Sequence, residues 1–254
     1  MNTSMSNTAQ KSVGIVGFGA FGKLIAQSLH GHFDLKAHDP RSDHHDVAAN
    51  LGVRFTSLEA VARCDMIVIA APVSSFEDVL VSIATVCRPG TLVIDVGSVK
   101  VHPADLMEKH LPDYVNIVAT HPLFGPQSAC DGIKGLKIAV CPIRGLKHWP
   151  LAVFLRKHLG LQVIMTTPHD HDREAATVQG LTHLIAKVLQ RMGPLPSRMT
   201  TRSFDLLVEA VSMVQTDAPE VFDAIEKANP YSADIRRSFF ELAHKLSVEL
   251  ESNV

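Results

Sequence analysis

The sequence predicts an α/β protein, in which a doubly wound, mostly parallel sheet is followed by a small all-α domain. Up to about residue 165, apolar runs without polar alternation, such as residues 66–70, alternate with segments of helical periodicity. From Asp170 onward, apolar residues recur at helical spacing and no strand-like run follows. We therefore expect a disordered tail over 1–11, a sheet domain over 12–166 and a helical domain over 167–254.

Each element follows from the same apolar periodicity. In the first domain, strands are expected at residues 12–17, 35–39, 66–70, 92–96, 114–120, 136–141 and 162–165. Helices are expected between them at residues 21–29, 44–51, 75–87, 103–111 and 151–159, with right-handed crossovers. The helical domain is expected to hold helices at residues 170–192, 201–215, 219–227 and 232–251. A Gly-Pro pair at 193–194 ends the first of these.

Composition excludes several classes of protein. Apolar residues make up 46% of the 254 residues and charged residues 20%, which is typical of a folded globular chain. A net charge of −2 gives no strong field for nucleic acid or an anionic membrane. The polar N-terminus lacks the apolar centre of a signal peptide, and the four cysteines form no CxxC pair. A cytoplasmic protein without a structural metal is expected.

A glycine-rich turn lies between the first expected strand and the first expected helix. It has the pattern G-x-G-x-x-G and consists of Gly17, Phe18, Gly19, Ala20, Phe21 and Gly22. Its glycines permit the tight turn, the approach of a pyrophosphate and close helix packing, and the helix start binds the phosphates. Asp39 ends the next strand 17 residues later, where an acid binds the ribose of NAD. Three glycines in an ordinary turn are the alternative, but this context predicts a Rossmann-type dinucleotide-binding domain.

The preferred cofactor depends on two neighbouring residues. Asp39 would repel the extra phosphate of NADP, whereas Arg41 is close enough in sequence to bind it. NAD is therefore expected, with NADP possible, and Ala71 and Ser98 are placed in the same cofactor site. Histidines and acids surround Asp39 without the spacing of a catalytic metal site, so a solvated loop is expected there: His38, His44, His45, Asp43 and Asp46.

Two polar segments follow neighbouring strands, at the edge where open α/β sheets bind ligands. Ser98 follows the strand at 92–96, and His121 follows the strand at 114–120. A neutral histidine can accept the proton of a hydroxyl group while the hydroxyl-bearing carbon gives a hydride to nicotinamide. Ser98 would hold that hydroxyl or the imidazole in position. The alternative is that His121 only caps a turn before Pro122.

These motifs resemble the prephenate and arogenate dehydrogenases, a family that acts at the last or penultimate step of tyrosine synthesis. The resemblance rests on the glycine-rich turn, Gly-Ser-Val-Lys at 97–100, Thr-His-Pro-Leu-Phe-Gly-Pro at 120–126, His-Asp-Arg at 171–173 and Gln-Gly-Leu-Thr-His at 179–183. It covers essentially the whole chain and is closest to the short, plant-like arogenate dehydrogenases. The segment at 120–126, combined with those at 171–173 and 179–183, carries the resemblance, and the glycine-rich turn contributes little to it.

The resemblance implies a reaction and a catalytic pair. The family substrate is a cyclohexadiene with a ring hydroxyl opposite a quaternary carbon that bears a carboxylate. Hydride leaves the hydroxyl-bearing carbon, CO2 leaves the opposite carbon, and the ring becomes aromatic. By resemblance, His121 accepts the hydroxyl proton, and Ser98 positions His121.

The resemblance also implies roles for the helical domain, which is similar to the dimerisation domain of the family. A homodimer is expected. Asp172 matches an acidic position associated with choosing arogenate, whose side chain carries an ammonium, over prephenate, which carries a keto group. The alternative for Asp172 is a favourable charge near the start of its own helix. Gln179, Thr182 and His183 share a helical face that would line the substrate pocket, although His183 fits equally well as a buried interface histidine.

One feature departs from the family. Many bacterial members bind the ring carboxylate with an arginine in the second helix of this domain, where this chain has Asp205. Four other arginines are weak candidates for that cation: Arg173, Arg202, Arg236 and Arg237. Two alternatives to the family reaction are a related hydroxyacid or imine reductase and a dinucleotide-binding sensor without catalysis.

Overall fold

The protein contains one eight-stranded sheet. The computed structural model describes residues 10–41, 44–215 and 217–252, so most of the expected tail, and Asp43, lie outside the described residues. The strands are β1 (Ser12–Val16), β2 (Asp34–His38), β3 (Arg54–Phe55), β4 (Met66–Ile69), β5 (Leu92–Asp95), β6 (Asn116–Pro122), β7 (Lys137–Arg144) and β8 (Gln162–Met165). Their order is β3-β2-β1-β4-β5-β6-β7-β8, and every neighbouring pair is parallel except β6 with β7. The predicted doubly wound, mostly parallel sheet is confirmed.

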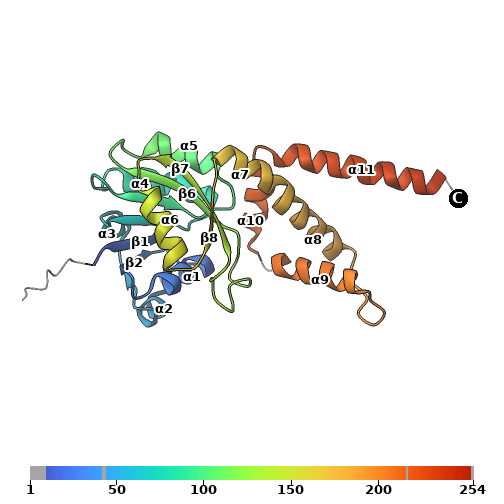
Figure 1. The fold of residues 1–254 in the computed structure, drawn as a ribbon, viewed down its shortest axis with the longest axis horizontal. Coiled ribbons are helices and arrows are strands. Elements are labelled where there is room, and N and C mark those ends of the chain that lie inside the picture. The colour runs from blue at the N-terminus through green and yellow to red at the C-terminus, as the bar shows by residue number, and fades with distance from the viewer. Residues whose placement is uncertain (1–9, 42–43, 216, 253–254) are drawn as a thin grey trace, which may run out of the picture.

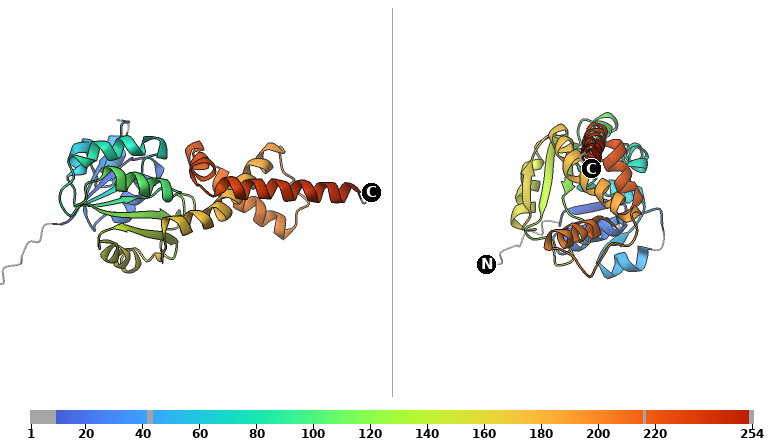
Figure 2. Two further views of the ribbon diagram at one scale, coloured as in Figure 1. Left: turned by 90° about the horizontal axis from the view of Figure 1, so that it is seen from above. Right: turned by 90° about the vertical axis from the view of Figure 1, so that its right-hand side faces the viewer.

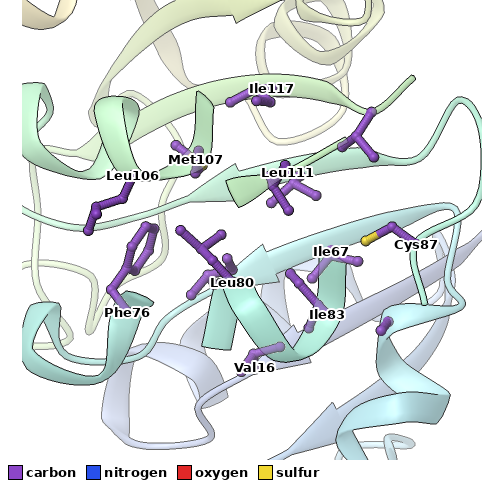
Figure 3. Packing of buried hydrophobic residues seen from close by; sticks show 14 of the residues in the cluster. Val16, Ile67, Phe76, Leu80, Ile83, Cys87, Leu106, Met107, Leu111 and Ile117 are labelled. Carbon is purple, nitrogen blue, oxygen red and sulfur yellow. The ribbon is translucent and has the colours of Figure 1, made fainter. Parts of the chain in front are cut away.

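Helices cover both faces of this sheet (Figure 1). They are α1 (Ala20–Leu29), α2 (His45–Asn50), α3 (Leu58–Ala62), α4 (Phe76–Ala84), α5 (Val101–His110) and α6 (His148–Lys157), and a short 3-10 turn at Val73–Ser75 precedes α4. Alternate strand residues face opposite layers. Ile67 packs with α3, α4 and α5, whereas Val68 packs with α1 and α2. Figure 3 shows Leu80 and Ile83 of α4 lying against Ile67.

Two elements of this part were missed by the sequence patterns. β3 is only two residues long, which is too short to show a period of two. α3 is five residues long, and its start is fixed by Ser57, whose hydroxyl accepts a hydrogen bond from the amide of Ala60 at 3.3 Å.

β6 extends to Pro122, two residues beyond the expected strand, so His121 lies within the strand and not after it.

The C-terminal part is helical, as predicted. It consists of α7 (Pro168–Ala175), α8 (Leu181–Arg191), α9 (Arg202–Gln215), α10 (Pro219–Asp223) and α11 (Ser232–Ser252), with π-helical turns η3 (Ala176–Gly180) and η4 (Ala224–Ala228). α7, η3 and α8 form the helix expected at 170–192, but the π turn was not predicted. The last helix, α11, is 21 residues long and runs away from the sheet (Figures 1 and 2). Among the described residues, no helix is both long and apolar enough to cross a membrane.

A buried ion pair joins the carboxyl ends of β5 and β6. Lys100 is fully buried, and its ammonium contacts the carboxylate of Asp95 and donates to the carbonyl of Thr120 at 2.6 Å. Asp95 also accepts from the amide of Thr120 at 3.2 Å. Burial raises the pKa of Asp95, although the adjacent Lys100 acts in the opposite direction. Each charge therefore depends on the other, because an unpaired buried charge is costly.

Replacing one partner of this pair should destabilise the fold. Lys100→Met leaves the Asp95 carboxylate buried without its cation, so we expect the free energy of unfolding in urea to fall by about 3–5 kcal/mol. Lys109→Met is the control, because Lys109 forms an exposed ion pair with Glu77 at 3.1 Å, and its loss should cost less than about 1 kcal/mol. Equal losses in the two variants would contradict the expected dependence of Asp95 on Lys100.

Candidate active site

The glycine-rich turn has the geometry that a dinucleotide requires. Gly17 has φ +92°, and a Cβ there would lie 2.6 Å from the carbonyl oxygen of Ala70. A Cβ on Gly22 would lie 2.1 Å from the carbonyl oxygen of Gly17, so only glycine allows α1 to pack this closely. A Cβ on Gly19 would meet nothing within 4 Å. The turn therefore has open space at Gly19 among the described residues, and the N-cap residue of α1, Gly19 itself, provides no side-chain cap.

Phe18 lies in the turn with its side chain in the core. Its side chain is fully buried and packs edge-on against Phe55, with ring centroids 6.1 Å apart. Its amide donates a hydrogen bond to Asp39 at 2.7 Å. Phe18 therefore anchors the turn to the core and to Asp39, and its side chain does not face a ligand. In the same turn, Ala20 is exposed and Phe21 is half-buried beside Phe124.

Asp39 and Arg41 lie together at the end of β2. The carboxylate of Asp39 accepts from the amide of Arg41 at 2.9 Å, and the Arg41 Nε lies 3.8 Å from it. Burial alone would raise the pKa of Asp39, but the amides of Phe18 and Arg41 and the charges of His44 and Arg41 outweigh it, so its pKa lies below the usual value. Asp39 is thus a fixed carboxylate near the turn. Ala71 is also near, since its amide nitrogen lies 3.0 Å from the Cβ position of Gly17.

His121 lies at the centre of a buried polar cluster. It is 4% exposed, and its Nδ1 lies 2.8 Å from Nε2 of His171 on α7. Nδ1 of His171 in turn lies 2.8 Å from the carboxylate of Asp172. On the other side of the ring, Nε2 of His121 lies 3.4 Å from the side-chain nitrogen of Gln179 in the π turn η3. Sheet and helical part thus meet at His121.

The surroundings of His121 favour its neutral form. Burial lowers the pKa of His121 well below its usual value, and the charges of His171 and Lys100 act in the same direction. At neutral pH the imidazole therefore has a free lone pair. This is the state required of a proton acceptor.

Asp172 differs from both sequence-based expectations. Its carboxylate is fully buried and accepts hydrogen bonds from the amide of Lys100 at 2.7 Å and that of Val101 at 2.9 Å. It therefore caps the N-terminus of α5 rather than facing an open pocket or stabilising the start of its own helix. These amides and His171 contact both oxygens of the carboxylate, so this geometry does not favour a direct contact with a substrate ammonium.

The other predicted site residues are placed as follows. No hydrogen bond joins Ser98 to His121 within the part of the chain that the structure describes, although Ser98 is half-buried in the loop after β5. Thr182 donates to the carbonyl of Val178 at 2.7 Å. His183 is buried, and its two ring nitrogens lie 2.9 Å from the carbonyl of Gln179 and 3.2 Å from the carboxylate of Asp217. This arrangement matches the alternative of a satisfied buried histidine, and the substrate role of His183 stays a prediction.

Three of the four candidate arginines are already paired. They are Arg173 with Asp170, Arg236 with Glu226 and Arg237 with Asp234. Arg202 at the start of α9 is exposed, and it has no acidic partner among the described residues. Two further residues of the site, His171 and Lys100, were not singled out from the sequence. Their motifs were noted, but only the tertiary structure brings both beside His121.

Comparisons with known proteins agree with this geometry. Residues 26–138 match the family model for the nucleotide-binding domain of prephenate dehydrogenase. The chain is 32% identical over 230 residues to arogenate dehydrogenase 2 of Arabidopsis thaliana. This match covers 86% of this chain and 64% of that protein. The chain is thus similar to prephenate and arogenate dehydrogenases over most of its length. Arogenate dehydrogenase 1 of the same plant is 28% identical, and the match covers 97% of this chain but only 40% of that relative. The chain thus spans less than two thirds of either plant dehydrogenase.

Solved structures of dehydrogenases in this family share the fold. The prephenate dehydrogenase of A. aeolicus, in complex with hydroxyphenyl propionate and NAD+, has a TM-score of 0.73 at 22% identity, over 97% of this chain and 94% of that one. The Synechocystis arogenate dehydrogenase has a TM-score of 0.66 at 19% identity, over 94% and 93%. At these identities the likeness establishes the fold, including the helical C-terminal part.

The glycine geometry predicts two separable defects. Gly19→Ala should keep the free energy of unfolding within about 0.5 kcal/mol, since its Cβ meets nothing, but should weaken nicotinamide dinucleotide binding at least tenfold. Gly22→Ala should lower the unfolding free energy by at least about 2 kcal/mol, because its Cβ collides with the backbone of Gly17. Urea unfolding and calorimetric titration with NAD test both. Unchanged NAD binding by Gly19→Ala would remove the turn from the cofactor site.

Proposed function

We propose that the protein catalyses the NAD(P)-dependent oxidative decarboxylation of arogenate to tyrosine or of prephenate to 4-hydroxyphenylpyruvate. The observation that carries this proposal is His121, a buried imidazole held neutral near the carboxyl ends of the strands. The dinucleotide turn follows β1 in the same sheet. The similarity to arogenate and prephenate dehydrogenases supports the same reaction.

The chain supplies orientation and a proton acceptor. A bound nicotinamide dinucleotide would supply the hydride acceptor, held by the turn at 17–22 and by Asp39. Nε2 of His121 accepts the proton of the ring hydroxyl, so that the carbon–oxygen bond becomes the carbonyl form as the hydride leaves. Loss of CO2 from the opposite carbon then gives the aromatic phenolate, which takes the proton back from His121 to become the phenol. Because His121 is buried, water has little access to its lone pair and competes little with the substrate hydroxyl for it.

Arogenate is slightly preferred in this proposal, and the plant relatives support that preference. A direct Asp172–ammonium contact no longer contributes to the argument, because the carboxylate is used within the chain. NAD is preferred over NADP because Asp39 is fixed beside the turn, where a 2′-phosphate would meet its negative charge. The exposed Arg41 is the residue that would allow NADP. The expected cytoplasmic location stays a prediction, since the plant relatives are named chloroplastic.

A homodimer through the helical part belongs to the same proposal. Large apolar side chains are exposed along α8, α9 and α11, including Val188, Met192, Leu206, Met213, Phe240, Leu242, Leu246 and Leu250. Exposed apolar surface of this extent favours association, and a two-fold axis would let each copy cover the other.

Turnover should depend strongly on His121. We expect reduced nicotinamide to form with arogenate and with prephenate, faster with arogenate and faster with NAD than with NADP. His121→Asn should lower kcat by about 100- to 10,000-fold while the Kd for NAD stays within about twofold, because only proton transfer is removed. Stopped-flow absorbance and calorimetric titration measure the two quantities.

His102→Asn is the matched control, since His102 is an exposed histidine on α5. It should retain full turnover. If wild-type protein binds NAD but turns over neither substrate, the proposed reaction is wrong, and a related reductase or a dinucleotide sensor takes its place. Equal kcat for His121→Asn and wild type would remove His121 from the mechanism.

The dimer is tested by light scattering at micromolar concentration, where we expect twice the mass of the chain. Leu246→Glu on α11 should shift the protein towards monomer, because it places a charge on the proposed interface. Leu146→Glu is its control, since Leu146 is 75% exposed in the sheet part, far along the chain from these helices. A monomeric wild type, or equal behaviour of the two variants, would overturn the proposed interface.

A further inference from the structure

We infer that His171 is a positioning residue that fixes the tautomer of His121 and then receives its proton. The inference rests on the proposed function, in which Nε2 of His121 is the proton acceptor. It is carried by the chain of contacts from Asp172 through His171 to His121, with each step at 2.8 Å.

The direction of these hydrogen bonds starts at α5. The amides of Lys100 and Val101 can only donate, and each donates to one oxygen of Asp172, at 2.7 and 2.9 Å. Both oxygens are therefore acceptors, as in an ionised carboxylate at a helix N-terminus. Nδ1 of His171 must then carry the hydrogen that it shares with Asp172.

The remaining ring nitrogens follow from this assignment. When Nδ1 carries the one hydrogen of the His171 ring, Nε2 of His171 offers a lone pair, and Nδ1 of His121 donates to it. The lone pair of His121 then lies on Nε2, on the side of Gln179. A substrate hydroxyl that replaced the amide of Gln179 would meet this lone pair. The other tautomer of His121 would present an N–H there and could not act as a base.

The same contacts provide a place for the proton after the reaction. When the hydroxyl proton binds Nε2 of His121, the proton on Nδ1 can move to Nε2 of His171, which breaks one N–H bond and forms another. The positive charge then lies on His171, beside the Asp172 carboxylate, instead of on His121, beside the ammonium of Lys100. No additional reactant is needed.

The tautomer can be measured directly. In long-range 1H–15N spectra of the full chain labelled with 15N-histidine, we expect His121, assigned by its absence in His121→Asn, to be protonated at Nδ1. In His171→Leu, the proton of His121 should move at least partly to Nε2, and kcat should fall about 100-fold with the KM for NAD within about twofold. His171→Gln should recover part of kcat, because its amide oxygen can accept from Nδ1 of His121.

A pH profile separates this role from a purely structural one. The charged or titratable groups around His121 and His171 include Lys100, Asp95 and Asp172, and Cys141 of β7 interacts with all three. The charge of His171 is one of the causes that lower the pKa of His121 in wild type. In His171→Gln that charge is lost, so the acid limb of kcat/KM, which reports protonation of His121, should move to higher pH. His169→Gln, an exposed histidine on the same helix, should change neither the limb nor kcat.

Each result decides the inference. A wild-type His121 protonated at Nε2, or a folded His171→Leu with unchanged tautomer and kcat, would overturn it. If His171→Leu does not fold, the wild-type tautomer and the acid limb of His171→Gln decide instead. The spectra need no substrate, so failure of the proposed reaction would appear as absent turnover, independently of the tautomer of His121.

Discussion

The carboxylate of Asp172 connects the two parts of the molecule. Asp172 lies on α7, the first helix after the sheet. Its carboxylate accepts hydrogen bonds from the amides of Lys100 and Val101 at the start of α5, the helix that follows β5. The backbone carbonyl of Asp172 also accepts a hydrogen bond from the side-chain amide of Asn229 at 2.8 Å. Three segments distant in sequence therefore meet at one residue. Because the carboxylate also orients His171, the packing of the helical part on the sheet and the state of the imidazoles depend on the same buried charge.

A second buried charge acts on the same strand ends. The backbone amide of Lys100 donates a hydrogen bond to Asp172, and its side-chain ammonium forms an ion pair with Asp95. One residue therefore links both carboxylates. Its cation lies near enough to His121 to lower the pKa of that imidazole. Neutralising this lysine would therefore alter stability and proton affinity together. A buried ion pair of this kind contributes more to the electrostatics of the site than to net folding energy.

Local patterns predicted the frame of the fold but not its contacts. The apolar runs at β1, β4 and β5 identified buried strands, and the glycine-rich turn placed α1, because these signals depend on neighbouring residues. β3 and α3 were missed, because a two-residue strand and a single short helical turn show no clear apolar period. Both π turns lie inside segments expected as continuous helices, and apolar spacing did not distinguish them from α-helix. His121 and Asp172 were singled out, yet the relation between them was not, because His171 meets His121 across 50 positions of sequence. Burial of Asp172 likewise follows from tertiary packing, and no helical periodicity encodes it.

The π turn at 176–180 fixes the rotational register of the long helix that contains it. A π turn holds one more residue than an α-helical turn, so the side chains of α8 are rotated relative to those of α7. Gln179 points to His121, while the adjacent Gly180 lies against Glu226 of the second π turn. Deleting one residue here would leave His171 in place but turn the whole of α8 by about 100°. The length of this segment, and not only its residue types, is therefore under constraint.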